Sequence, residues 1–115
     1  MSGFGHYERS AAELEREIVI RGIMIGLDWG NPPQIHALAR EALSCSPAQR
    51  LALLRSPDRK KKAMGELFAF SALMLDIMRQ GAGAGVRVPG GKVWDIFERA
   101  LAAARDQGAE SGDLP

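Results

Sequence analysis

The sequence has a single cysteine, no long apolar run and almost no net charge, and each of these scarcities excludes a class of protein. Cys45 is the only cysteine among 115 residues, which excludes an internal disulfide framework and favours a reducing compartment. The most apolar stretch, residues 18–27, contains Arg21 and has about half the length that a bilayer span requires. The opening MSGFGHYERS lacks the basic start and apolar core of a signal peptide. We therefore expect a cytoplasmic protein with no membrane partner, in the style of small bacterial regulatory proteins.

The composition is that of one globular domain. Hydrophobic residues make up 46% of the chain and charged residues 25%, and 115 residues suffice for one ordinary domain. We expect a flexible N-terminus over residues 1–9, one helical domain over 10–106 and a disordered tail over 107–115.

Three segments share a pattern in which a side chain that can cap a helix precedes proline. They are Asn31-Pro32, Ser46-Pro47 and Ser56-Pro57. Proline at the first helical position loses no hydrogen bond, and the Asn or Ser oxygen can accept from the next free N–H groups. Gln34 and Gln49 have the spacing of a capping box, and Ser10 with Glu13 gives a fourth possible start.

These starts and the spacing of apolar residues predict an all-α fold, a single-domain bundle of four to five helices. The predicted helices cover residues 11–29, 32–44, 47–54, 57–80 and 91–106. The helix at about 57–80 is expected at the centre, and a flexible connection over 81–90. The first helix is expected to stop at Gly30. Its Gly22 and Gly26 would let another helix approach closely. Trp29 and His36 are expected to be structural, with a role in binding as the alternative.

The middle of the long predicted helix is apolar on every side. The polar line that Lys62 and Glu66 begin is interrupted before it resumes at Asp76. A helix on the surface of a bundle normally keeps a polar stripe, and leftover apolar surface commonly marks an interface. We therefore expect a homodimer, with a monomer wrapped by its own helices as the alternative. The candidate self-association face comprises Ala69, Phe70, Leu73 and Ile77.

Positive charge is concentrated in one segment. Six of the 15 basic residues lie between Arg50 and Lys62, with only Asp58 of the 14 acidic ones. The helix at 47–54, a tight turn and a basic second helix outline a helix-turn-helix, which places the start of its second helix in the major groove. The candidate surface, here called the basic surface, comprises Arg55, Arg59, Lys60, Lys61 and Lys62.

The basic surface has three interpretations: a solvated run of charge, a site for an acidic protein partner, or a nucleic-acid site. The apolar character of the second helix and the acidic remainder of the chain weaken the last. We expect a small interaction or regulatory protein of cytoplasmic location, with a helix-turn-helix-like nucleic-acid-binding protein as the alternative.

The possible catalytic and cofactor motifs fail on geometry. GAGAG at 81–85 follows a helix instead of the strand that a dinucleotide fingerprint needs, and Gly91-Lys92 precedes Val93 instead of the Ser or Thr of a P-loop. His36 and Cys45 are nine residues apart, so if both lie on one helix they point to opposite faces, which argues against a nucleophile–base pair unless Cys45 sits in a non-helical turn that folds back. An enzyme that uses Cys45 is therefore kept only as a third interpretation. We expect no catalysis, no metal and no cofactor.

Overall fold

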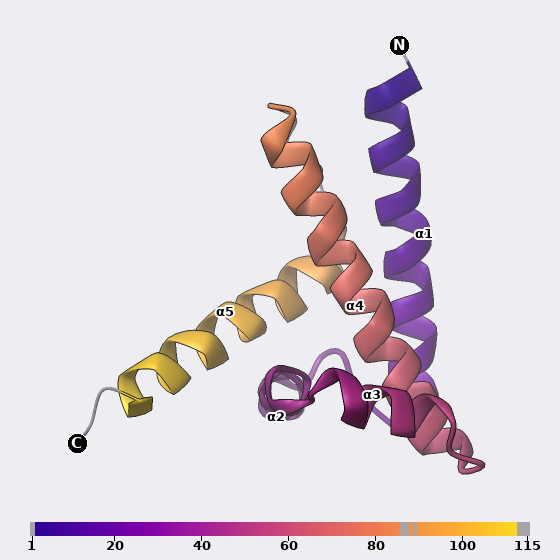
Figure 1. Cartoon of the computed structure of the whole chain (residues 1–115), viewed down its shortest axis with the longest axis vertical. Helices are drawn as coiled ribbons and strands as arrows, with labels where there is room; N and C mark the ends of the chain where they lie inside the picture. Colours follow the sequence, from indigo (N-terminus) through magenta and orange to yellow (C-terminus); the bar gives the residue numbers. More distant parts are fainter. Residues whose placement is uncertain (1, 86–87, 89, 113–115) are drawn as a thin grey trace.

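The computed structural model describes residues 2–85, 88 and 90–112, and side chains between Arg9 and Gln107. Within that part of the chain it contains five helices and no strand, which confirms the predicted all-α bundle (Figure 1). The helices are α1 (Ser2–Met24), α2 (Pro32–Ser44), α3 (Pro47–Leu54), α4 (Arg59–Gly83) and α5 (Lys92–Gly112).

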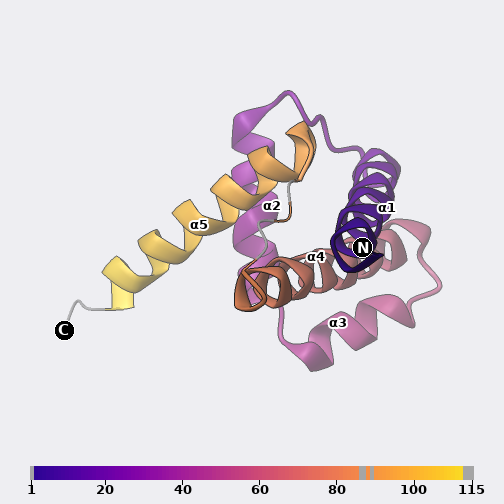
Figure 2. The same ribbon diagram turned by 90° about the horizontal axis from the view of Figure 1, so that it is seen from above.

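The long helix α4 lies between α1 and α3, and α2 packs against α5 as a second pair (Figures 1 and 2). α1 and α4 run in opposite directions along each other, and α1 also touches α5. The molecule measures 45 × 40 × 29 Å along its principal axes.

The core is formed where α1, α2, α4 and α5 meet. The largest fully buried side chains are Trp94, Phe97, Ile18, Ile35, Leu67 and Met74. Complete burial of a large apolar side chain stabilises the fold by about 1.5–3 kcal/mol. These residues therefore hold α1 and α4 against α2 and α5. By contrast, no residue of α3 is buried. α3 therefore covers one side of α4 without contributing to the centre of the core.

The first helix begins earlier and ends earlier than predicted. Its backbone is helical from Ser2, so the start predicted from Ser10 and Glu13 is wrong; the flexibility predicted for residues 1–9 stays a prediction. Gly26 ends it with a φ of 82°, while the Gly26 N–H donates to the Ile23 carbonyl (3.0 Å) and the Leu27 N–H to the Gly22 carbonyl (2.9 Å). This pair of bonds is a Schellman motif, which needs a left-handed residue and so selects glycine. The stop is therefore Gly26, and the predicted stop at Gly30 is wrong.

Gly22 makes room for an indole ring. A Cβ atom at Gly22 would lie 2.6 Å from Cζ2 of Trp29, so the prediction that Gly22 and Gly26 admit a neighbouring helix is wrong. The Trp29 Nε1–H donates to the Val19 carbonyl over 3.4 Å, and its ring meets Phe97 edge to face at 6.0 Å. These contacts give Trp29 a structural role in joining the end of α1 to α5.

The predicted capping residues are partly confirmed. Ser46 and Gln49 form the expected capping box: the Ser46 N–H donates to Gln49 Oε1 (2.8 Å) and the Gln49 N–H to Ser46 Oγ (3.1 Å). Asn31 caps α2 by accepting from the Gln34 N–H. The Gln34 carboxamide does not complete a box there, because its oxygen accepts from the Asp28 N–H instead (2.9 Å).

α4 starts and ends later than predicted. Its N-cap is Asp58, whose carboxylate accepts from the N–H groups of Lys60 and Lys61, while Ser56 Oγ accepts from the Asp58 N–H. The helix continues to Gly83, so the first three residues of the expected flexible connection are helical and Gly81 is buried. Residues 86–87 and 89 of that connection, and 113–115 of the expected tail, lie outside the described residues.

A carboxylate on α1 caps α5. Glu15 Oε1 accepts from the Gly91 N–H (2.8 Å), and Oε2 accepts from the Trp94 N–H (2.9 Å). A Cβ atom at Gly91 would collide with this carboxylate. The glycine of the Gly91-Lys92 pair therefore leaves space for a capping side chain that comes from 76 residues earlier in the chain.

Candidate partner-binding surface

The structure brings the five residues of the basic surface to one end of the molecule. Arg55 is the C-cap of α3, and Arg59 to Lys62 form the first turn of α4. All five side chains are exposed. The positive end of the α4 dipole adds to their charge, and the only carboxylate of the turn, Asp58, already caps the helix.

No carboxylate neutralises this surface from within the described part of the chain. The ion pairs there join Arg21 to Glu17, Arg21 to Glu66 and Arg79 to Asp76. Arg21 is a cation with a structural role: besides its two ion pairs, its guanidinium lies over the Phe70 ring, 5.2 Å from the centroid. Among the described residues, the cations of the basic surface make no such contacts.

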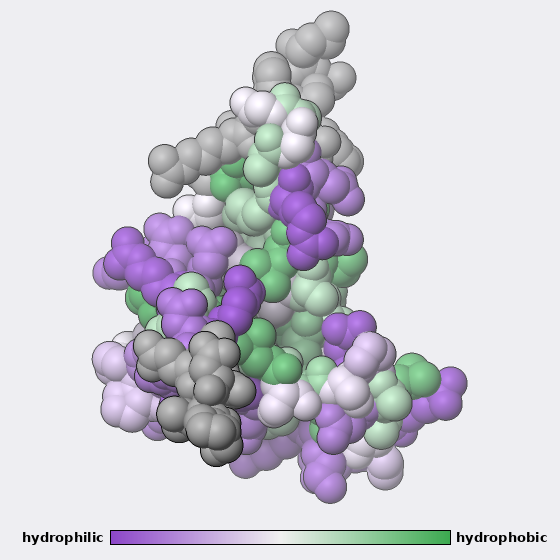
Figure 3. Space-filling view, turned by 60° about the vertical axis from the view of Figure 1, so that its left-hand side comes forward, coloured by the Kyte–Doolittle hydropathy of each residue, from purple (hydrophilic) through white to green (hydrophobic). Residues whose placement is uncertain are grey.

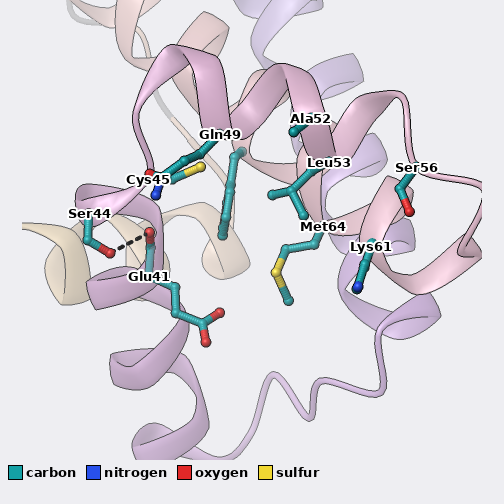
Figure 4. Close-up of a pocket in the computed structure, with 10 residues that line it drawn as sticks. Glu41, Ser44, Cys45, Gln49, Ala52, Leu53, Ser56, Lys61 and Met64 are labelled. Carbon is teal, nitrogen blue, oxygen red and sulfur yellow. Dashed lines mark hydrogen bonds between the residues drawn. The ribbon is translucent and has the colours of Figure 1, made fainter.

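A groove of about 610 Å³ opens beside the basic surface, between the end of α2, the inner side of α3 and the first half of α4. Ala52, Leu53, Met64 and Phe68 give it apolar walls. Figure 4 shows Lys61 on the α4 side and Glu41 across the opening, on α2. The remaining lining residues are Ser44, Cys45, Gln49 and Ser56. Lys61 thus belongs both to the groove and to the basic surface.

Gly65 sets the position of the groove wall. A Cβ atom there would lie 2.8 Å from Cβ of Leu53 and 3.0 Å from the backbone nitrogen of Leu54. α3 therefore touches the backbone of α4 at this point. Sequence reasoning missed the groove because it is built from three helices. Its one local signal was the sequence of α3, which is short and largely apolar.

The predicted self-association face is only partly open. Leu73 is 51% exposed, whereas Ala69, Phe70 and Ile77 are half-buried. Phe70, Leu73 and Ile77 line a cleft of about 420 Å³ that they share with Leu14 and other residues of α1. Further exposed apolar side chains lie near the end of α1: Ile20, Ile23 and Met24. On the face seen in Figure 3, hydrophobic groups alternate with hydrophilic ones.

The residues weighed for catalysis are not brought into a site. His36 is exposed on α2, and Cys45 is the half-buried C-cap of that helix, with its Sγ 3.7 Å from the Ser46 carbonyl oxygen. Across the described residues, no group of three or more His, Cys, Asp or Glu side chains is placed to hold a metal ion. None of the helices described there has both the length and the hydrophobicity needed to cross a bilayer.

Comparisons with known proteins returned nothing similar: no family model, no curated protein and no solved structure matches this chain.

Proposed function

We propose that this chain is a small cytoplasmic interaction protein with no catalysis of its own, which binds an acidic protein partner through the basic surface. One observation carries the proposal. Arg55 and the first turn of α4, Arg59 to Lys62, carry five exposed cations around one helix end, and none of them forms an ion pair with any described residue.

Folding gains nothing from this arrangement. Cations in the first turn of a helix are unfavourable by about 0.3–1 kcal/mol each, and the Asp58 cap offsets only part of that. A charge cluster that opposes folding and lacks internal partners is well suited to an external anion. Facing charges of opposite sign raise association rates and exclude partners with the wrong charge.

Nucleic acid is the second candidate. The observation that favours it is that α3, the turn at 55–58 and α4 follow in the order of a helix-turn-helix, with exposed cations at the start of the second helix. The groove beside these cations argues for protein instead, because its apolar walls offer nothing to a phosphate backbone.

Affinity capture with two charge-matched variants tests the proposal. In one variant Lys60, Lys61 and Lys62 become glutamine. In the control, the exposed cations Lys92, Arg99 and Arg105 of α5 become glutamine. We expect a partner with an acidic segment to be captured by the wild type and the control and lost from the first variant.

The same proteins should be titrated with random-sequence duplex DNA at two salt concentrations. Affinity that falls steeply with salt, and that the lysine variant alone loses, would replace the proposal with the nucleic-acid alternative. A partner that binds both variants equally would show that the basic surface is merely solvated.

We further propose that the chain forms a homodimer through Ala69, Phe70, Leu73 and Ile77. The exposed Leu73 and the open cleft that Phe70, Leu73 and Ile77 line support this, since closed two-fold pairing is the commonest way to cover such surface. Leu73→Lys should convert a dimer to a folded monomer in light scattering at micromolar concentration, and Ala72→Lys, also exposed on α4, is the control. A monomeric wild type would refute the proposal.

A further inference from the structure

We propose that the groove between α2, α3 and α4 is the seat of the partner, and that its occupant is an acidic amphipathic helix. The apolar side chains of that helix enter the groove and its carboxylates pair with the basic surface. This inference rests on the proposed function and adds where the partner binds and by what chemistry.

The groove is an open surface cavity with apolar walls. Leu53 and Met64 line it and are half-buried, and the α3 helix that forms one wall has no buried residue at all. An amphipathic helix laid into a groove buries such residues with anchors at positions i, i+3, i+4 and i+7.

The charges around the groove determine the character of the occupant. Lys61 lines it on the α4 side, next to the other cations of the basic surface, and Glu41 stands on the α2 side. Neither is in an ion pair with a described residue. A helix with most of its carboxylates towards α4 and a lysine or arginine towards Glu41 would match both sides, which fixes its orientation in the groove.

Other occupants use only half of this surface. A nucleic acid would pair with the cations and leave the apolar walls uncovered. A single fatty-acid carboxylate could place its chain in the groove, but it would neutralise one cation of five. The juxtaposition of an apolar groove with a cluster of unpaired cations therefore favours a segment that carries both apolar and acidic side chains.

The only cysteine of the chain offers a direct measure of groove occupancy. Cys45 lines the groove and is half-buried, so a bound helix should slow its alkylation by iodoacetamide. As a control, Cys45→Ser combined with Ala102→Cys moves the thiol to an exposed site on α5. Occupancy of the groove should slow alkylation of Cys45 and leave that of the relocated thiol unchanged.

The probes are helix-forming peptides of about 15 residues, roughly four turns, selected from a displayed library on the full-length wild-type protein. The library varies charge and apolar spacing independently. We expect the selected sequences to combine acidic residues with large apolar residues at helical spacing, and to protect Cys45. Ala52→Gln places a larger polar side chain at the groove and should weaken binding about tenfold, equivalent to about 1.4 kcal/mol. Ala72→Gln, at an exposed position elsewhere on α4, should not.

The outcomes separate the inference from the proposed function. If acidic peptides without apolar residues are selected equally, and Ala52→Gln and Cys45 alkylation show no effect, the basic surface binds acidic partners but the groove inference is wrong. If the selected peptides carry no acidic excess, or none are selected, both fail. Protection of Cys45 by sodium laurate but by no peptide would assign the groove to a lipid-like carboxylate and overturn the inference.

Discussion

Removal of the Glu15 carboxylate tests whether α1 and α5 are joined as the structure describes. Glu15 accepts from two N–H groups at the start of α5, those of Gly91 and Trp94. In Glu15→Ala both donors lose their acceptor. The Gly91 N–H is exposed and can turn to water, whereas the Trp94 N–H is partly buried and cannot do so fully.

The magnitude follows from these two donors and from the helix dipole. Loss of an N-cap side chain destabilises a protein by about 0.5–2 kcal/mol, and loss of a carboxylate from a helix N-terminus by about 0.3–1 kcal/mol more. We expect Glu15→Ala to lower the free energy of unfolding by about 2 kcal/mol. For a domain of this size the melting temperature should fall by about 8 °C. Glu15→Gln keeps one acceptor oxygen without the charge and should lose about half as much.

Gly91→Ala gives the decisive measurement, because its added methyl group would occupy the position of the Glu15 carboxylate. Alone, Gly91→Ala should be nearly as damaging as Glu15→Ala. Combined with Glu15→Ala it should add little, because the space is then free, so the double-mutant cycle should show a coupling of about 1 kcal/mol or more. Urea unfolding followed by circular dichroism measures all four proteins, with the exposed Glu13→Ala as control. Additive effects, or a Glu15→Ala variant within about 0.5 kcal/mol of wild type, would refute the contact.

Four further variants test other features. Gly65→Ala should lower the free energy of unfolding by about 1–3 kcal/mol, because its Cβ atom would collide with Leu53 and the Leu54 backbone. Gly83→Ala, whose Cβ atom meets nothing within 4 Å, should raise it by up to about 1 kcal/mol. If urea unfolding shows that both variants shift the stability in the same direction, the close approach of α3 and α4 is contradicted. Changing Lys60, Lys61 and Lys62 to glutamine should raise the melting temperature slightly, and a lower one would mean that these lysines have partners in the fold. Cys45→Ser should fold with a small loss of stability and still capture the acidic partner, and a folded variant that captures the partner but loses all biological activity would overturn the non-catalytic proposal.

Features that depend on neighbouring residues were predicted well from the sequence. The Ser46–Gln49 capping box, the cap at Asn31 and the proline starts of α2 and α3 each lie within a few residues, and the structure confirms them. The all-α class follows from the same local signals. The errors arose where two local signals competed. Both Gly26 and Gly30 could end α1, and both Ser56 and Asp58 could cap α4.

Contacts between distant segments could not be predicted in this way. The sequence around Gly91 resembles part of a phosphate loop, whereas the glycine leaves space for the Glu15 carboxylate. The sequence around Gly22 suggests a contact with another helix, whereas this glycine leaves space for the Trp29 ring. In each case the sequence indicated a position that needs space and did not indicate which residue fills it, because that residue lies on another segment.

The basic surface differs from these glycine positions, because no described residue of the chain pairs with its charges. Gly22, Gly65 and Gly91 each leave space, and the fold supplies the group that uses it: an indole ring, the backbone of α3 and a carboxylate. The groove beside Lys61 is also an open space, but no described residue fills it. Nor does any described residue form an ion pair with the cations of the basic surface. The complement of this surface, apolar and acidic together, is therefore best sought on another molecule.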